Sequence, residues 1–263
     1  MNSVVKLVFP FCLRRLRLRV LLFGIVFASM GLQVCHAQSP GVRLATRQFT
    51  APGGTPYLEL QAEFLANGVK WLVSSDTLYR AAVTWSVVAF DSTGAVAGFS
   101  KATARTDDLP FPGDFLDIAR IPLAPGPHVL ELEVMDLGAT EGATLKHEMV
   151  VEVDEPTTLD VSDLFLVQAV APGLSPPTSL TRSGLEVLPL VDQRISEDAQ
   201  AVPFYGELYG TDTRFGLDSA FLVVAGFASP DGDWIPETKR YIRMKGAPVL
   251  PLLETIPVPS AGV

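Results

Sequence analysis

Apolar and polar residues alternate with a period of two along several segments of this chain, and this alternation restricts the fold to β-structure. Residues 57–64 read Tyr-Leu-Glu-Leu-Gln-Ala-Glu-Phe, so one face of the segment is apolar and the other carries glutamate and glutamine. Residues 129–134 and 150–153 follow the same rule. Successive side chains of a strand point to opposite faces, so each segment predicts a half-buried strand. No segment keeps a helical period over three turns.

Turn residues separate the predicted strands. They are Asn67-Gly68, Thr93-Gly94, Pro125-Gly126 and Asp231-Gly232. Nearly continuous apolar runs at 164–170 and 220–227 predict strands that are covered on both faces. Short strands punctuated by glycine and proline are typical of antiparallel sandwiches. We therefore expect an all-β fold of two tandem immunoglobulin-like antiparallel β-sandwich domains.

The arrangement of residues 83–134 recurs from residue 219 onward. The glycine of the first turn, Gly94, corresponds to Gly232, and Gly126 corresponds to Gly262. The separations are 138 residues (232 − 94) and 136 residues (262 − 126). A period of this length indicates duplicated domains, because solenoid repeats recur every ~20–50 residues.

An acidic, proline-bearing link at 154–158 separates the two copies. We predict a signal peptide at 1–37, a first sandwich domain at 40–154 and a second at 159–263. In the second domain, the irregular stretches 172–184 and 193–202 are predicted to be surface loops.

The second copy reaches Gly262 without the strand that follows Gly126 in the first copy. Unless residues 187–190 or 249–253 take its place, we expect the second sandwich to be incomplete, with an open strand edge and an apolar groove. Such an edge invites a strand from another protein, by β-augmentation. The alternative is that the sequence is a truncated or frame-shifted copy of a longer protein.

The N-terminal segment has the organisation of a secretory signal peptide. Four arginines between residues 14 and 19 precede an uncharged apolar run at 20–32, and Cys35-His36-Ala37 follows. This pattern predicts export to the periplasm, the outer envelope or the exterior, with cleavage after Ala37. A retained membrane anchor is the alternative, although the run is shorter than the ~20 residues that span a bilayer. Val34 before Cys35 disfavours lipidation.

Removal of residues 1–37 makes the chain strongly acidic and free of cysteine. The segment carries five of the 20 basic residues and no acidic one, so 15 basic residues face 29 acidic ones and the net charge is −14. A surface of this charge repels nucleic acid. Both cysteines, Cys12 and Cys35, leave with the segment. Disulfides and thiolate metal sites are then excluded from the mature chain.

Motifs of catalysis and of cofactor binding are absent from the sequence, which predicts a protein that is not an enzyme and has no cofactor or metal. His128 and His147 lack partners at the spacing of metal ligands, and His128 is expected at the edge of a strand. Asp91 lies in Asp-Ser-Thr-Gly, where a hairpin turn favours these residues, so a protease has little support. Asp231 and Asp233 flank a matching turn and supply too few oxygens for calcium.

Aromatic residues give the candidate binding residues. Tyr205, Glu207 and Tyr209 share one face of the predicted strand 204–209, and Trp234 is expected to be exposed beside a turn. We expect Trp85 to lie in the core. The polar and aromatic face of Tyr205 to Tyr209 corresponds to that of residues 57–61, which suits packing between domains as well as a ligand site.

Ser162-Asp163-Leu164, Leu188-Pro189 and the run Phe204-Tyr205-Gly206-Glu207-Leu208-Tyr209 follow in order a Pro-Gly-led strand that ends at Asp136. This order resembles the N-terminal β-sandwich region of GWxTD domain-containing proteins of bacterial envelopes. The resemblance covers most of residues 57–231 and implies a secreted protein. The GWxTD motif itself is absent, the nearest piece being Gly232-Asp233-Trp234. The resemblance therefore implies no catalytic residues.

These patterns predict a secreted, non-catalytic envelope protein that acts as a protein-interaction or assembly module through the open edge of its second domain. Contact with a membrane is expected only through a retained signal segment. The alternative is a carbohydrate-binding or carbohydrate-processing protein that uses Trp234, Tyr205 and Tyr209. Retention on an insoluble polysaccharide that is lost in Trp234→Ala would favour that alternative.

Overall fold

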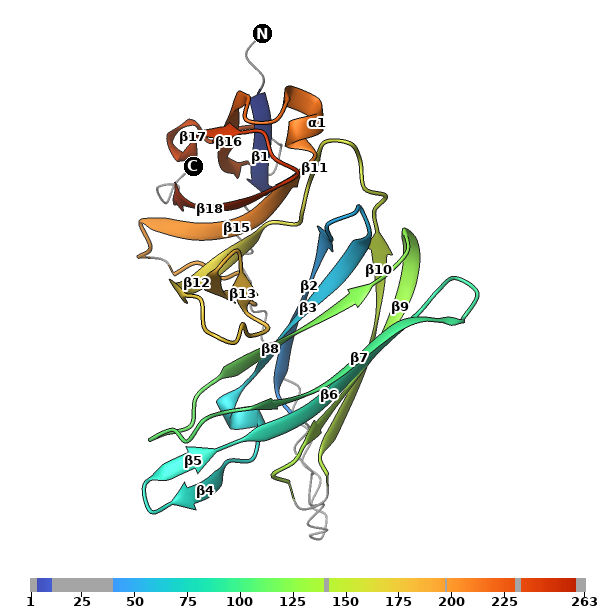
Figure 1. Cartoon of the computed structure of the whole chain (residues 1–263). Coiled ribbons are helices and arrows are strands. Elements are labelled where there is room, and N and C mark those ends of the chain that lie inside the picture. Colours follow the sequence, from blue (N-terminus) through green and yellow to red (C-terminus); the bar gives the residue numbers. More distant parts are fainter. Residues whose placement is uncertain (1–3, 11–39, 140–141, 197, 230–232, 259–263) are drawn as a thin grey trace, which may run out of the picture.

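The computed structural model describes residues 4–10, 40–139, 142–196, 198–229 and 233–258. Almost every described element is a strand, and nearly all pairs are antiparallel, which confirms the all-β sandwich fold (Figure 1). The longest described helix, α1 (Thr211–Phe215), has five residues. No helix in the described part of the chain is long and apolar enough to cross a membrane.

Two facing sheets form what we call the N-terminal sandwich. The first sheet has the order β2–β3–β8, with β2 at Val42–Thr50, β3 at Pro56–Phe64 and β8 at Phe115–Pro122. The second has the order β10–β9–β6–β7, with β10 at Thr144–Val153, β9 at Gly126–Asp136, β6 at Ala82–Phe90 and β7 at Val96–Arg105. A short hairpin of β4 (Leu72–Ser75) and β5 (Leu78–Arg80) and a 3-10 turn, η1 (Ala66–Gly68), lie beside them.

The core of the N-terminal sandwich contains the residues that the alternation placed inside. Leu58, Leu60, Ala62 and Phe64 of β3 are all buried in it. Trp85 of β6 is also buried, as expected, and its ring meets that of Phe64 edge-on at 6.2 Å between centroids. The apolar face of each strand therefore packs against the facing sheet, where burial of apolar area stabilises the fold.

A second pair of sheets forms the C-terminal sandwich. One sheet contains β11 (Asp160–Val161), β12 (Phe165–Pro172), β13 (Thr181–Arg182), β14 (Leu185–Pro189), β15 (Ala201–Tyr209) and β18 (Val249–Pro257). The other has the order β1–β16–β17, with β1 at Val4–Pro10, β16 at Ala220–Ala228 and β17 at Arg240–Lys245. A 3-10 turn, η2 (Pro236–Thr238), precedes β17. Phe204 of β15 and Val223 of β16 are fully buried between the two sheets.

The N-terminal segment supplies the only parallel pair in the described sheets. β1 runs alongside β16 from Val4 opposite Leu222 to Pro10 opposite Ala228 (Figure 1). The predicted apolar run and cleavage site at 11–37, with both cysteines, lie outside the described residues. The predicted domain bounds and the signal peptide itself remain predictions.

Two segments that were candidates for the missing strand pair elsewhere. β18 lies next to β15, and β14 lies between β12 and β13. Neither is paired with β16. The place next to β16 that β9 occupies next to β6 in the N-terminal sandwich is therefore held by β1.

The expectation that 172–184 is a surface loop is wrong at Arg182. Thr181 and Arg182 form β13, and the side chain of Arg182 is 3 % exposed because it pairs with a buried carboxylate of the N-terminal sandwich. The predicted loop 193–202 ends earlier than expected, because β15 already begins at Ala201.

Candidate functional site

Three of the four predicted binding residues lie together on β15, facing the N-terminal sandwich. The hydroxyl groups of Tyr205 and Tyr209 donate hydrogen bonds of 2.7 and 2.8 Å to the carboxylate of Glu207. The Tyr209 hydroxyl also accepts the backbone N–H of Thr50 at 3.1 Å. Both tyrosines are buried. A sugar ring stacks on an exposed aromatic face, and neither tyrosine offers one.

The fourth predicted residue, Trp234, lies apart from the other three. It precedes β17, and its ring packs over Gly226 on β16, where a Cβ atom would come within 3.0 Å of the indole. The ammonium group of Lys239 lies 5.4 Å from the ring centroid. Trp234 is half-buried, so the structure gives it a packing contact and does not join it to the tyrosines.

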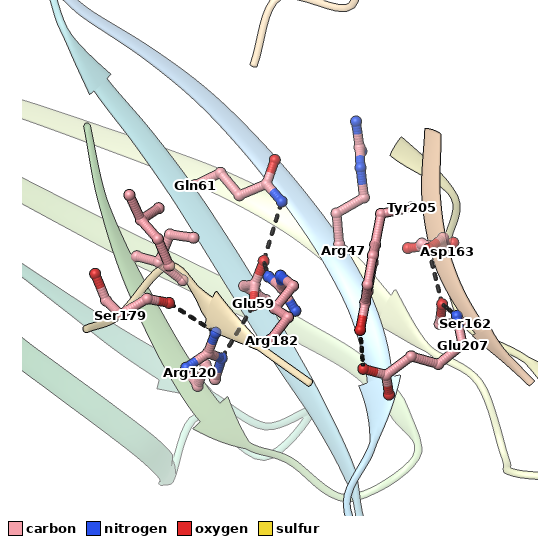
Figure 2. Close-up of polar contacts among 12 residues, drawn as sticks. Arg47, Glu59, Gln61, Arg120, Ser162, Asp163, Ser179, Arg182, Tyr205 and Glu207 are labelled. Atoms are coloured by element: carbon pink, nitrogen blue, oxygen red, sulfur yellow. Dashed lines mark hydrogen bonds and ion pairs between the residues drawn. The ribbon is translucent and has the colours of Figure 1, made fainter. Parts of the chain in front are cut away.

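A buried carboxylate joins the two sandwiches. Glu59 on β3 is fully buried, and the guanidinium groups of Arg120 and Arg182 converge on it (Figure 2). Arg120 donates from Nε to Glu59 at 3.0 Å, and Gln61 donates to the same carboxylate at 3.0 Å. Arg120 belongs to the N-terminal sandwich and Arg182 to the C-terminal one. The ion pairs therefore connect elements that are far apart in the sequence.

Aromatic rings surround Arg182. Its guanidinium carbon lies 4.9 Å from the ring centroid of Phe49, 5.3 Å from that of Phe165 and 5.2 Å from that of Tyr205. A guanidinium group is attracted to the negative face of such rings. Phe49 comes from the N-terminal sandwich and the other two from the C-terminal one, so Arg182 and its rings form a shared core between them.

The link between the sandwiches is fastened at both ends to Gln48 of β2. The side-chain amide of Gln48 exchanges two hydrogen bonds of 2.8 Å with the backbone of Asp154, where the link begins. The backbone N–H of Gln48 donates to the carboxylate of Asp163 at 2.8 Å, and its carbonyl accepts the N–H of Asp163 at 3.0 Å. The link therefore forms part of the junction between the sandwiches.

Burial at this junction changes the ionisation of its tyrosines. Removal from water raises the pKa of Tyr57 to about 12, and the carboxylates of Glu207 and Glu59 act in the same direction. Burial, followed by the charge of Glu207, also raises the pKa values of Tyr205 and Tyr209. Each of these phenols therefore stays neutral at a pH where an exposed tyrosine begins to ionise.

The raised pKa values predict a loss of stability at alkaline pH. A group whose pKa is higher in the folded state stabilises that state fully below its unfolded pKa, which is ~10 for tyrosine. That stability is lost as the pH rises through the folded pKa. We expect the free energy of unfolding to fall between pH 10 and about 12. Urea titrations at several pH values would measure this. Tyr209→Phe removes one of the phenols and should make the free energy of unfolding fall less steeply with pH. An unchanged dependence on pH would contradict the prediction.

A shallow pocket of ≈ 310 Å³ opens beside the junction. Its lining residues are Ala51, Thr55, Pro56, Tyr57, Arg120 and Pro122. Arg120 is its only charged group, and that guanidinium is already bound to Glu59 and to the carbonyl oxygen of Ser179 at 2.8 Å. These two contacts hold the guanidinium of Arg120 within the junction.

Asp91 and His128, whose side chains were weighed for catalysis, form hydrogen bonds within the protein. The carboxylate of Asp91 accepts the hydroxyl and backbone N–H of Thr93 and the N–H of Ala95, as the turn interpretation predicts. These bonds, with the Thr93 hydroxyl foremost, hold the pKa of Asp91 below its ordinary value. His128 is buried in β9 and His147 is exposed on β10. Within the described ranges, no three acidic, histidine or cysteine side chains gather as metal ligands.

The edge of β16 that β1 covers is the remaining candidate binding site, and it opens only if residues 4–10 leave it. Its nine residues, Ala-Phe-Leu-Val-Val-Ala-Gly-Phe-Ala, include no charge. β17, the outer strand on the other side, carries Arg240, Arg243 and Lys245, all exposed. Charged residues on an edge strand block pairing with other chains. β17 is thus protected as an edge by its charges, whereas β16 lies between β17 and β1 in the structure and has no such charges of its own.

The comparisons with known proteins give no family. No family model matches the chain, and no curated protein matches it. Among solved structures, a β-glucosidase from Paenibacillus barengoltzii aligns with 80% of this chain at 13% identity and a TM-score of 0.20. The alignment spans 19% of the length of that enzyme. A likeness of this size carries no argument about the fold or the function.

Proposed function

We propose that this protein is an exported, non-catalytic interaction module that binds another protein by accepting a strand at the edge of β16. The observation that carries the proposal is the pairing of β16 with Val4–Pro10. That segment lies inside the predicted signal peptide. If the signal peptide is removed on export, β17 is the one strand among the described residues that stays paired with β16.

Comparison of the two sandwiches supports this proposal. In the N-terminal sandwich, β6 is an inner strand, with β7 on one side and β9 on the other. Leu130, Leu132 and Val134 of β9 complete the core there. β16 has the apolar composition of an inner strand, and among the described residues β1 alone holds the position that corresponds to β9. An exposed apolar edge readily pairs with an added strand.

The predicted resemblance to the N-terminal region of GWxTD domain-containing envelope proteins agrees with this role. It suggests an envelope location, where a strand donor would be another secreted or envelope protein. We also propose that the two sandwiches are duplicated domains that follow one another along the chain.

The proposal is tested by comparing the exported protein with its precursor. The chain is produced with its own N-terminus in a bacterial host, and the intact mass of the exported product is measured. We expect the loss of residues 1–37 and strong fluorescence of an apolar dye. The unprocessed precursor, made by cell-free synthesis, should bind less dye because β1 covers the edge.

Two variants locate the dye-binding surface. Leu222→Lys places a charge on β16, next to the open edge, and should reduce dye binding by the exported product. Tyr241→Lys is the matched control, because Tyr241 is exposed on the already basic β17. An exported product that retains residues 4–10, or a monomer that binds no dye, would contradict the proposal.

A further inference from the structure

We propose that the strand accepted by β16 runs parallel to it and comes from an extended apolar segment of another polypeptide, about seven residues long, as β1 is. This inference rests on the proposed function and specifies the chemistry of its partner.

Within Leu222–Ala228, the stretch of β16 that pairs with β1, four residues direct their N–H and C=O groups to the open edge. Phe227 points the other way, because its N–H donates to the Thr238 hydroxyl at 2.9 Å and its carbonyl accepts the N–H of Ile235 at 2.9 Å. Thr238 and Ile235 both lie on the β17 side. Backbone groups alternate between the two edges of a strand. Within the stretch that pairs with β1, the residues directed to the open edge are therefore Leu222, Val224, Gly226 and Ala228.

The register of β1 shows how a parallel strand meets these groups. In a parallel pair, a residue directed at its neighbour bonds to the two residues that flank its Cα partner. Val224 is opposite Lys6, and Gly226 is opposite Val8. The register therefore assigns Val5, Leu7 and Phe9 of the incoming strand to hydrogen bonding with β16, and directs the N–H groups of Lys6 and Val8 away from it.

The same register defines the side chains that the position favours. Val223, Ala225 and Phe227 of β16 are buried in the core, and they lie opposite Val5, Leu7 and Phe9. In the N-terminal sandwich, the strand at the corresponding position buries three alternate apolar residues, Leu130, Leu132 and Val134. A suitable partner segment therefore has three apolar residues at alternate positions and no charge between them on that face.

The occupant belongs to another polypeptide because the described strands of this chain are already paired. β14 and β18 are the segments that could have filled the position, and both are held in the facing sheet. A seven-residue segment of this chain pairs with β16 in the structure, so a parallel strand of this length can be accommodated there.

The probe for the experiment is a synthetic peptide with the sequence of residues 4–10, Val-Val-Lys-Leu-Val-Phe-Pro, added to the exported protein. Two modified peptides test the register. Methylation of the Leu7 nitrogen removes an N–H that faces β16, and we expect binding to weaken by about tenfold or more, since one lost hydrogen bond and its unpaired acceptor have that order of cost. Methylation of the Val8 nitrogen, which faces away, is the matched control and should change affinity little.

Direction is measured through Trp234, which pairs with Ala228 at the end of β16 where Pro10 lies. A quencher on the peptide C-terminus should reduce Trp234 fluorescence more than the same quencher on the N-terminus. The reverse order would show an antiparallel strand and overturn the inference. In Trp234→Phe, this difference should disappear.

The outcomes separate this inference from the proposed function. If the exported product binds apolar dye and the peptide does not bind, the parallel apolar partner is wrong and strand addition stands. Equal weakening by the two methylated peptides also overturns the inference. If neither dye nor peptide binds, both proposals fail together.

Discussion

Replacement of Arg182 by methionine is expected to lower the free energy of unfolding by about 3–5 kcal/mol, because it leaves the carboxylate of Glu59 buried with less compensation. Glu59 has no exposed surface, and Arg182 is 3 % exposed. Arg120 remains, but it is more exposed and binds the other carboxylate oxygen. The substitution also removes the charge that Phe49, Phe165 and Tyr205 surround. Urea denaturation at neutral pH measures the loss.

Two further variants control this experiment. Arg43→Met removes a cation that pairs with Glu63 at 2.9 Å on the surface, and it should cost much less because exposed pairs are screened by water. Glu59→Met combined with Arg182→Met removes both buried charges and should recover much of the loss. If Arg182→Met were no more harmful than Arg43→Met, the buried ion pair would not hold the sandwiches together.

Replacement of Trp85 by alanine should lower the free energy of unfolding by about 3–5 kcal/mol, as large-to-small changes in a packed core do. Trp85 is 1 % exposed at the centre of the N-terminal sandwich, and its indole N–H donates to Asp117 at 2.9 Å. The substitution leaves a cavity beside Phe64 and removes the hydrogen bond to that carboxylate. A lowered midpoint of urea denaturation, with an unchanged slope, would show this loss.

Phe99→Ala is the matched control for Trp85. Phe99 lies on the neighbouring strand β7, is 73 % exposed and points to the opposite face of the same sheet. Its removal should have little effect on the unfolding midpoint. Comparable losses in the two variants would mean that the facing sheets do not form the core described above.

Much of the fold could be predicted from the sequence because strand alternation is a local signal. Leu58 and Leu60 were placed inside correctly, since the period of two determines which residues share a face. Glu59 and Gln61 were placed on the opposite face, which is also correct, but both are buried. Alternation determines the face of a residue and not what covers that face. Here the C-terminal sandwich covers it.

The binding residues were harder to predict because their surroundings come from distant parts of the chain. Tyr205, Glu207 and Tyr209 were grouped correctly on one strand, yet their contact with Thr50 depends on a junction that no local pattern encodes. The burial of Arg182 was not predicted, because a single arginine in a glycine- and proline-rich stretch is typical of a solvent-exposed loop. Its partner, Glu59, is 123 residues away.

The pairing of β1 with β16 was missed for a different reason. Residues 4–10 were predicted to be part of a signal peptide. That prediction implies that the segment is cleaved off, and it says nothing about a strand that the segment could form. The sequence predicted a C-terminal sandwich that lacks a strand, and in the structure β1 lies beside β16. The sequence contained no signal for which segment would fill it.

The attachment of Gln48 to both Asp154 and Asp163 has a mechanical consequence. The stretch of chain between these two residues is closed at its base, so a proteolytic cut within it would leave the two halves associated through Gln48, Glu59 and Arg182. If a partner strand bound to β16 were pulled, the force would be transmitted to the N-terminal sandwich through this junction. The segment between Asp154 and Asp163 would extend little, because both of its ends are hydrogen-bonded to Gln48.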